Sequence, residues 1–197
     1  MPGQAEVWLM DLPPRGVDHV GRPVGWPGRH LVAKAAASVS CRATGQACRP
    51  RKQLDSRARC LDCGAWWTAS QVAHHAAVAR SNVSVGIDVE DRRHRPAAFR
   101  RASRWCGVAL SAAEQWTQAE AVWKAMGAGR RTPNDSEIPL NESWQVGWQL
   151  SRDSQWWIYT TGQPQPWSLA FPADDGNPPN LIFRSTTVAA DNLTKGA

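Results

Sequence analysis

Two acidic side chains lie two residues apart in the apolar segment 85–90, which has the sequence VGIDVE. The alternation predicts a strand that buries its valine and isoleucine side chains and places Asp88 and Glu90 on the opposite face, with Gly86. At a rise of about 3.3 Å per residue, the two acidic Cα atoms would be roughly 6–7 Å apart. Carboxylates this close repel each other unless a cation lies between them, and Mg²⁺ favours such oxygen ligands. The segment therefore indicates a magnesium site, and the alternative is an edge strand with a solvated acidic face.

A third carboxylate, Glu120, lies in the segment 116–127, which has the sequence WTQAEAVWKAMG. Glu120 and Lys124 are four residues apart, so on a helix they are neighbours in the favourable acid-before-base order. The spacing of the apolar residues predicts that this helix buries one stripe, made of Trp116, Ala119, Trp123 and Met126. Taken alone, the Glu120–Lys124 pair is an ordinary surface ion pair. Beside the buried stripe it lies at the core boundary, where a cleft could form.

The rest of the pattern predicts the elements that position these side chains. Residues 91–104 are expected to form an arginine-rich loop or the start of a helix, and residues 72–78 a strand or a buried turn. A helix is expected from Ser111 to about 126, because Ser111 and Glu114 have the spacing of a capping box. Residues 41–64 are polar and basic, which predicts an irregular connector, and the polar residues from 174 onward predict a loose tail. The other expected elements are a strand at 7–10, a helix at 29–39, a hairpin at 144–150 and 155–160, and a strand at 167–171.

The charge of the chain is uneven. The formal net charge is +6 over 197 residues, with 17 Lys/Arg against 8 Asp/Glu up to residue 110, and 6 against 9 after it. A basic half favours a polyanionic partner, such as a nucleic acid, a phosphorylated cofactor or an acidic protein, although a solvated basic face is the alternative. No segment resembles a signal peptide or reaches the roughly 20 apolar residues of a membrane span, so a cytoplasmic protein with no membrane partner is expected.

Five cysteines, an odd number, favour a reducing compartment over a disulfide framework. Four of them, Cys41, Cys48, Cys60 and Cys63, could form a zinc site, but only the last pair has the usual ligand spacing, so free or structural thiols are the alternative. Basic residues surround these cysteines, which would suit a nucleic-acid-binding module. Against that module, no recognition-helix or RNA-binding signature is present, and the acidic strand face would repel phosphate without a metal.

Together the segments 85–90 and 116–127 resemble the two signature motifs of the 4′-phosphopantetheinyl transferase superfamily. The first motif, (V/I)G(V/I)D(V/I)E, is present in full, and the second, W-x-x-K-E-(A/S)-x-x-K-x-x-G, keeps Trp116, Glu120, Ala121, Lys124 and Gly127. The resemblance spans about residues 5–173 and implies an α+β fold of two similar subdomains, each a small, mostly antiparallel sheet packed on a helix. The implied division is a shortened N-terminal subdomain at 1–80, a C-terminal subdomain with the metal-binding motifs at 81–173, and a flexible tail at 174–197.

The resemblance implies Mg²⁺-dependent transfer of 4′-phosphopantetheine from coenzyme A to a serine of an acyl or peptidyl carrier protein. The helix of Glu120 would pack against the VGIDVE strand, so that three carboxylates converge on the metal: Asp88, Glu90 and Glu120. Glu120 or a metal-bound water would accept the serine proton. Lys124 would neutralise pyrophosphate oxygens. The expected contacts of coenzyme A are Lys34, Lys124, His74 and His75, and the basic half would receive its phosphates and an acidic carrier helix.

The sequence also departs from the family pattern. Ala69 stands where the family has the histidine of its Ser-x-Ser-His signature, Ala119 replaces the lysine before the motif glutamate, and residues 60–64 do not match the usual nucleotide-holding stretch. His74 and His75 could substitute for the missing histidine, although paired histidines near a strand are commonly structural. Two alternatives therefore stay open. One is a relative recruited to another biosynthetic reaction, and the other is a non-catalytic scaffold whose carrier binding is indifferent to Asp88→Ala.

Overall fold

The computed structural model describes residues 3–13, 25–53, 57–92, 95–127, 131–162, 165–174 and 176–184. Within these residues the protein is α+β, with two sheets whose strands are antiparallel to their neighbours except where β1 and β10 run parallel. The six-stranded sheet has, in order, β10 (Asn180–Arg184), β1 (Gln4–Asp11), β5 (His75–Ser81), β4 (Trp66–Val72), β3 (Ala58–Cys60) and β2 (Pro50–Lys52). The four-stranded sheet has β6 (Gly86–Val89), β9 (Trp167–Pro172), β8 (Trp156–Thr161) and β7 (Gly147–Leu150).

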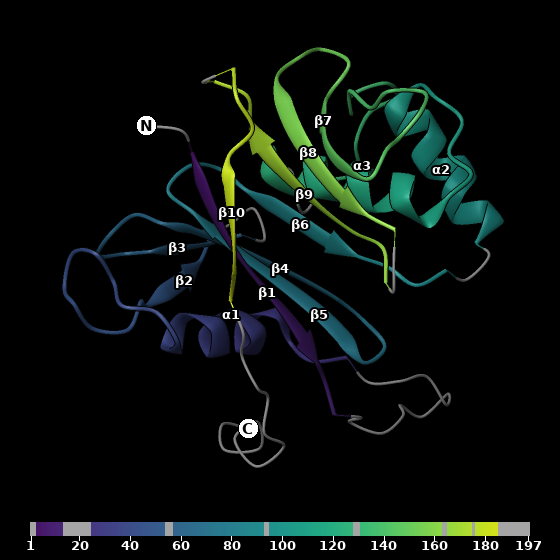
Figure 1. Ribbon diagram of the computed structural model, residues 1–197. Helices are drawn as coiled ribbons and strands as arrows, with labels where there is room; N and C mark the ends of the chain where they lie inside the picture. Colours follow the sequence, from purple (N-terminus) through teal and green to yellow (C-terminus); the bar gives the residue numbers. More distant parts are fainter. Residues whose placement is uncertain are drawn as a thin grey trace.

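The helices cover the outer faces of the two sheets (Figure 1). Helix α1 (Gly28–Ala37) packs on the six-stranded sheet, over the stacked rings of Trp8 and Trp67, whose centroids are 5.4 Å apart. Helices α2 (Pro96–Cys106) and α3 (Ala113–Ala125) pack on the four-stranded sheet, around Ile158 and Ala170. A third apolar cluster joins the two sheets to each other, and its members include Val7, Ala79, Ile87 and Leu169. The order of layers is therefore helix, sheet, sheet, helices.

The side chains of strand β6 alternate between two faces, as the pattern in 85–90 predicts. The valine and isoleucine side chains enter the cluster between the sheets. Gly86 lies against α3, where an added Cβ would be 1.9 Å from the Ala121 carbonyl oxygen and 2.5 Å from the Ala125 nitrogen. Only a glycine allows this approach of the helix backbone, and the approach brings the Glu120–Lys124 segment beside Asp88.

Buried hydroxyls fix how α3 sits on the four-stranded sheet. Thr117 Oγ1 lies 2.7 Å from Ser168 Oγ on β9, and Gln118 Nε2 donates to Thr160 Oγ1 on β8 at 2.8 Å. Each of these four side chains is buried, and buried polar groups need such partners. The buried face of α3 is accordingly wider than the predicted apolar stripe, and Met126, expected inside that stripe, is exposed.

The structure corrects several local expectations. Residues 41–64 are not an irregular connector, because β2 and β3 form an antiparallel pair there. In residues 72–78 the expected strand is present as the end of β4 and the start of β5, and the turn between them is exposed rather than buried. Helix α3 begins at Ala113, and Gln115 Oε1 accepts the Ser111 N–H at 2.8 Å, so the predicted capping box of Ser111 and Glu114 is wrong. Glu114 is buried and is bound instead by Arg92.

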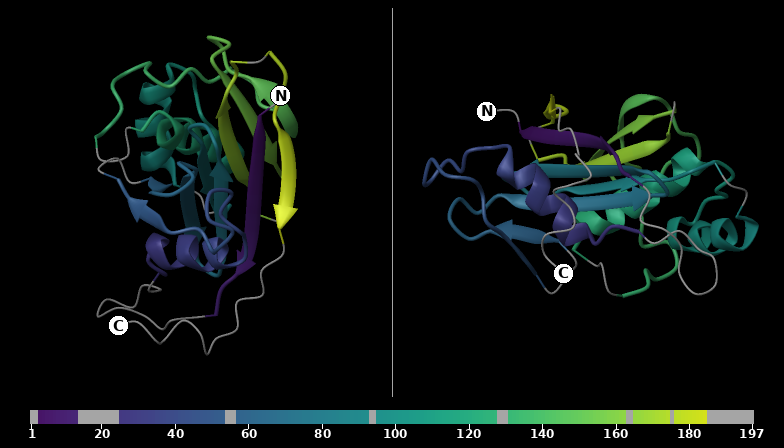
Figure 2. Two further views of the ribbon diagram at one scale, coloured as in Figure 1. Left: turned by 90° about the vertical axis from the view of Figure 1, so that its left-hand side faces the viewer. Right: turned by 90° about the horizontal axis from the view of Figure 1, so that it is seen from below.

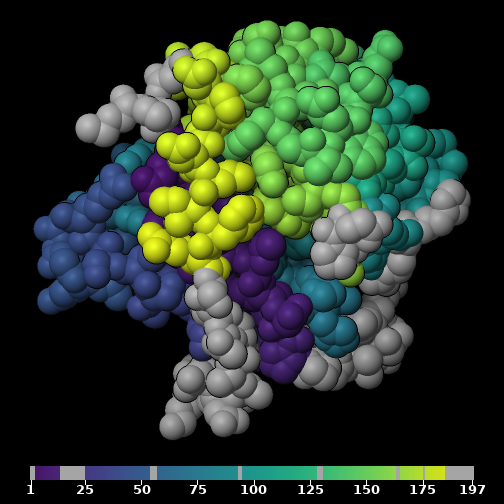
Figure 3. Space-filling view, in the orientation of Figure 1, coloured from purple at the N-terminus to yellow at the C-terminus, as the bar shows by residue number. Residues whose placement is uncertain are grey.

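The predicted loose tail is wrong for the segment Asn180–Arg184, which forms β10. This strand pairs with β1 in parallel, from Gln4 opposite Asn180 to Trp8 opposite Arg184. Figure 2 shows the two strands side by side at the edge of the six-stranded sheet, and Figure 3 shows β10 on the surface next to β1. The predicted elements at 7–10, 29–39, 85–90, 144–160 and 167–171 are confirmed, with shifts of a few residues at their ends.

Candidate functional site

Asp88, in β6, is the best-buried carboxylate of the predicted set. Its side chain is 7% exposed, and its Oδ1 accepts hydrogen bonds from Lys124 Nζ and from Ser70 Oγ, each at 2.6 Å. Lys124 Nζ also donates to the Ile87 carbonyl oxygen at 3.2 Å. Asp88 therefore joins the two sheets and α3 at one point, because Ser70 belongs to β4 and Lys124 to α3.

Glu120 lies one helical turn before Lys124, and its Oε2 is 4.0 Å from Lys124 Nζ. Burial raises the pKa of Glu120 to about 7, and the nearby Asp88 and Glu90 charges act in the same direction. Burial opposes the charge on Lys124, but its carboxylate neighbours, Asp88 first, hold the pKa of its ammonium group above the ordinary value. The single ammonium group of Lys124 therefore neutralises only part of the negative charge of these carboxylates.

Glu90 completes the cluster one residue beyond β6. Its Oε2 accepts from Arg95 Nη1 at 3.0 Å, and its Oε1 accepts from the Asp91 backbone N–H at 2.9 Å. Burial raises the pKa of Glu90, and the charge of Asp88 adds to that effect against the opposing influence of Arg95. The charge of Asp88 thus acts on both Glu90 and Glu120.

Cations of the chain already hold two of these carboxylates. Lys124 binds Asp88 and Arg95 binds Glu90, so a metal ion would need one or both ion pairs to open. The donor set still fits a hard divalent cation, because it offers several buried carboxylate oxygens whose negative charge is incompletely neutralised. Among the described residues, the group whose ligand atoms all lie close enough together to share one ion is a different one. It consists of Cys41, Cys48, Cys60 and Cys63.

Arginines of α2 form a basic surface beside the cluster. Ala97, Arg100, Arg101 and Arg104 line an open cavity of about 470 Å³, and the charge of Arg101 lowers the pKa of Glu120. This helix was predicted as an arginine-rich loop or a helix start, and it runs from Pro96 to Cys106. The carboxylates therefore lie next to a surface that can bind phosphate or another acidic group.

The residues expected to contact coenzyme A do not gather at this cluster. Lys34 lies on α1, which covers the opposite face of the six-stranded sheet from β6. His74 is exposed in the β4–β5 turn. His75 Nδ1 lies 3.0 Å from Asp11 Oδ1, and its side chain lines a cavity of about 340 Å³ together with Val89. Of the four expected contacts, only Lys124 lies within the carboxylate cluster.

Sequence reasoning missed two contacts and one cavity. Ser70 and Arg95 bind the carboxylates, and β4, which presents Ser70, was not predicted as a strand. A cavity of about 320 Å³ lies between the start of α1 and strands β2 to β4, and its basic lining residues are Arg29, Lys52 and Arg57. Ala69, at the position of the family histidine, also lines it. Alternation in residues 66–72, with Ser70 two residues from Thr68, could have indicated strand β4. It could not have indicated that Ser70 binds Asp88.

Comparison of the sequence with models of protein families and with curated proteins finds no match. The resemblance to the transferase superfamily therefore depends on the residues of the two motifs. The structure places these motifs in direct contact, through Gly86 and through the Asp88–Lys124 pair. Among the described residues, no helix combines the length and the apolar character that a membrane span requires.

Proposed function

We propose that this protein is a Mg²⁺-dependent transferase that moves 4′-phosphopantetheine from coenzyme A to a serine of an acyl or peptidyl carrier protein. The observation that supports this proposal is the meeting of the VGIDVE strand and the 116–127 helix at one buried cluster of carboxylates. The α+β architecture, with two mostly antiparallel sheets and their helices, agrees with the two-subdomain fold that the family resemblance implies.

The cluster has the composition that the reaction needs. Asp88, Glu90 and Glu120 would hold Mg²⁺, which supplies neutralisation of the charge that develops as the phosphoanhydride breaks. Lys124 holds Asp88, and its ammonium group would bind a pyrophosphate oxygen once the carboxylates bind a cation. Glu120 or a metal-bound water would accept the serine proton, because both would lie at the metal beside the attacking hydroxyl.

Two basic surfaces suit the two substrates. The cavity lined by Arg29, Lys52 and Arg57 can accept phosphates of coenzyme A, and Ala69, at the position of the family histidine, is part of its lining. The arginine face of α2, beside Glu120, can bind an acidic carrier helix. The charge asymmetry of the chain, basic in its first 110 residues, is consistent with both roles.

Intact-mass spectrometry of carrier proteins tests the transfer directly. Apo acyl and apo peptidyl carrier proteins are incubated with the protein, coenzyme A and Mg²⁺, and we expect the carrier to gain one phosphopantetheine group. Glu120→Gln is the matched variant, since it keeps the size of the side chain and removes its charge, and we expect the gain to be lost. Arg131→Gln is the control, because Arg131 pairs with Glu137 on the exposed surface.

Three other results would point elsewhere. Isothermal calorimetry that finds Mg²⁺ binding, lost in Asp88→Ala, with no transfer to any carrier would favour a relative recruited to another reaction. Carrier binding that persists in Asp88→Ala without transfer would favour a non-catalytic scaffold. A lack of both Mg²⁺ binding and transfer would contradict the proposal, because the carboxylates would then serve only as partners of Lys124 and Arg95.

A further inference from the structure

Four cysteines from separate parts of the chain meet at one place. Cys41 follows α1, Cys48 precedes β2, Cys60 ends β3 and Cys63 lies in the next turn. Their four Sγ atoms all lie within 4.8 Å of one another, and all four thiols are free. The Sγ atoms of Cys48 and Cys63 are 3.9 Å apart. A disulfide would hold two sulfurs about 2.0 Å apart, whereas four sulfurs about 2.3 Å from a central zinc ion would be about 3.8 Å from one another.

The backbone around Cys41 and around Cys60 folds into the same turn. The Cys41 N–H donates to the Gln46 carbonyl oxygen, and the Cys60 N–H donates to that of Ala65, so each cysteine binds the residue five positions later. Four positions after each cysteine, Gly45 and Gly64 donate back to its carbonyl oxygen, at 2.8 and 3.0 Å. Both glycines have positive φ, at 70° and 73°. Two turns with the same hydrogen bonds thus present two cysteines to one centre.

These turns aim backbone N–H groups at sulfur. Cys41 Sγ accepts from the N–H groups of Ala43 and Thr44, and Cys60 Sγ accepts from those of Asp62 and Cys63. Both turns supply N–H groups from the second and third residues after the cysteine, and Cys60 Sγ also accepts from the Arg49 N–H. Hydrogen bonds of this kind stabilise negatively charged sulfur and orient it, as groups around metal ligands do.

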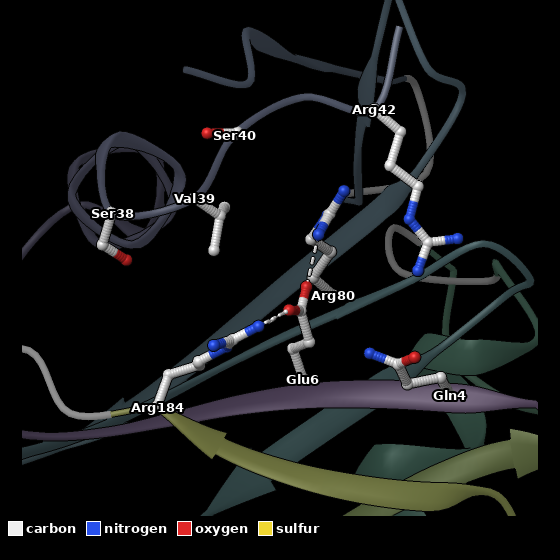
Figure 4. Close-up of a pocket in the computed structure, with 8 residues that line it drawn as sticks. All are labelled: Gln4, Glu6, Ser38, Val39, Ser40, Arg42, Arg80 and Arg184. Atoms are coloured by element: carbon white, nitrogen blue, oxygen red, sulfur yellow. Dashed lines mark hydrogen bonds and ion pairs between the residues drawn. The ribbon is translucent and has the colours of Figure 1, made fainter. Parts of the chain in front are cut away.

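A buried cation adjoins the same sulfurs. The Arg80 side chain is 6% exposed, and the nearby Cys48 and Cys63 sulfurs help to raise the pKa of its guanidinium group. Its other partner is Glu6, which Arg184 also binds, with Arg184 Nη2 2.6 Å from Glu6 Oε1 (Figure 4). Four thiolates around one divalent ion carry two negative charges in total. A buried guanidinium group beside them compensates part of that charge, which neutral thiols would not require.

We propose that Cys41, Cys48, Cys60 and Cys63 bind one zinc ion as a closed tetrathiolate site. Soft thiolate ligands in a tetrahedral arrangement select zinc over magnesium or calcium, and a site with four protein ligands is structural rather than catalytic. Three of the ligands are buried and belong to the cluster beneath α1. The ion would tie the loop after α1 to the β2–β3 hairpin, which carries Lys52 and Arg57 of the 320 Å³ cavity. This inference is independent of the proposed transfer.

Metal analysis of the purified full-length protein tests the site. The protein is prepared under reducing conditions, and inductively coupled plasma mass spectrometry should find one zinc per chain. Replacement of the metal by Co²⁺ should give the thiolate-to-cobalt charge transfer and the strong visible bands of tetrahedral sulfur coordination. Cys63→Ser should lose both signals, whereas Cys106→Ser should keep them, because Cys106 is buried in the α2–α3 cluster away from the site.

The wild-type spectrum decides the question even if Cys63→Ser fails to fold. Protein without bound metal, whose Co²⁺ spectrum shows no sulfur charge transfer, would overturn the proposal. Iron in place of zinc would overturn the choice of metal. An intact mass lighter by pairs of hydrogens, restored by a reductant, would mean that the cysteines form disulfides, and would also overturn it.

Discussion

Lys124 Nζ lies 2.6 Å from Asp88 Oδ1, although the two residues are 36 positions apart and belong to α3 and β6. The pair is the contact through which the two sequence motifs meet. Lys124 faces two further carboxylates and the Ile87 carbonyl oxygen, so each contact described for its ammonium group is with an acceptor. A cation is therefore required at this position, whether it is the lysine alone or the lysine together with a metal.

Lys124→Met tests this requirement. The variant leaves Asp88 and Glu120 without their shared cation, which should lower the free energy of unfolding by about 3–5 kcal/mol. Mg²⁺ should restore part of that loss and raise the unfolding temperature of the variant more than that of the wild type. Thermal unfolding followed by circular dichroism, with and without Mg²⁺, measures both effects.

Lys34→Met is the control for this experiment, because Lys34 lies on α1 across the six-stranded sheet. It should change neither the stability nor the response to Mg²⁺ by more than a few tenths of a kcal/mol, as expected of a substitution away from buried features. A Lys124→Met variant as stable as the wild type, or one that ignores Mg²⁺, would contradict the requirement for a cation.

Gly86→Ala should separate β6 from α3. The new Cβ would lie 1.9 Å from the Ala121 carbonyl oxygen, and backbone atoms cannot rotate away as a side chain can. We expect a loss of about 3 kcal/mol or more, at the upper end of overpacking effects. Urea unfolding measures the loss, and Gly28→Ala is the control, since no atom lies within 4 Å of a Cβ at that position. Equal stabilities of the two variants would mean that the helix and strand can move apart without cost.

Glu6 should make the fold sensitive to acid. Burial alone would raise the pKa of Glu6, but the hydrogen bonds from Arg184 and Arg80 hold it below the ordinary value of 4.5. Stability from the ionised group is therefore complete above pH 4.5 and declines as the pH falls toward the folded pKa. Glu6→Gln should lose about 3–5 kcal/mol at neutral pH, because Arg80, which is buried, and Arg184 lose the carboxylate that they share, and should unfold with less dependence on acid.

Denaturant unfolding at pH 7 and in steps below pH 4.5 separates these two effects of Glu6. A Glu6→Gln variant that loses stability in acid as steeply as the wild type would show that other carboxylates dominate the acid response. Glu137, whose exposed partner Arg131 lowers its pKa to about 2, supplies a surface comparison through Glu137→Gln.

Arg80→Gln should weaken metal binding at the cysteine cluster. Arg80 is the buried cation beside Cys48 and Cys63, and the loss of such a supporting group typically costs 10–100-fold in metal affinity. Competition with a coloured chelator measures the change. Arg184→Gln is the matched control, since it also removes a partner of Glu6 but leaves the contact with sulfur in place. Equal zinc affinities in the two variants would show that Arg80 serves only Glu6.

The strand and helix of the carboxylate cluster were predictable because their signals are local. Alternation in 85–90 assigns Ile87 to the core and Asp88 to the other face, and helical spacing makes Glu120 and Lys124 neighbours. Local sequence patterns do not reveal which side chains of other elements bind each carboxylate. Ser70 reaches Asp88 from another sheet, and Lys124 turns toward Asp88 at 2.6 Å rather than toward Glu120 at 4.0 Å.

The cysteine cluster and β10 could not be predicted from sequence patterns, because both depend on contacts between distant parts of the folded chain. Cys41 and Cys48 lack the usual spacing of a ligand pair, and the chain brings them to Cys60 only through the folding of β2 and β3. Residues 180–184 are bounded by polar and proline-rich sequence, so their composition suggested a tail. Their strand exists because β1 offers them a free edge, which is a property of the folded sheet rather than of the segment.

The parallel pairing of β1 with β10 also sets an order of assembly on the ribosome. Strand β1 is synthesised more than 170 residues before β10 ends at Arg184, so the outer edge of β1 stays unpaired until that residue has emerged. During that interval its backbone N–H and C=O groups can pair with a second nascent chain, as open strand edges do. A truncation before residue 180 would make this exposure permanent, and the product should form aggregates that the full-length chain avoids.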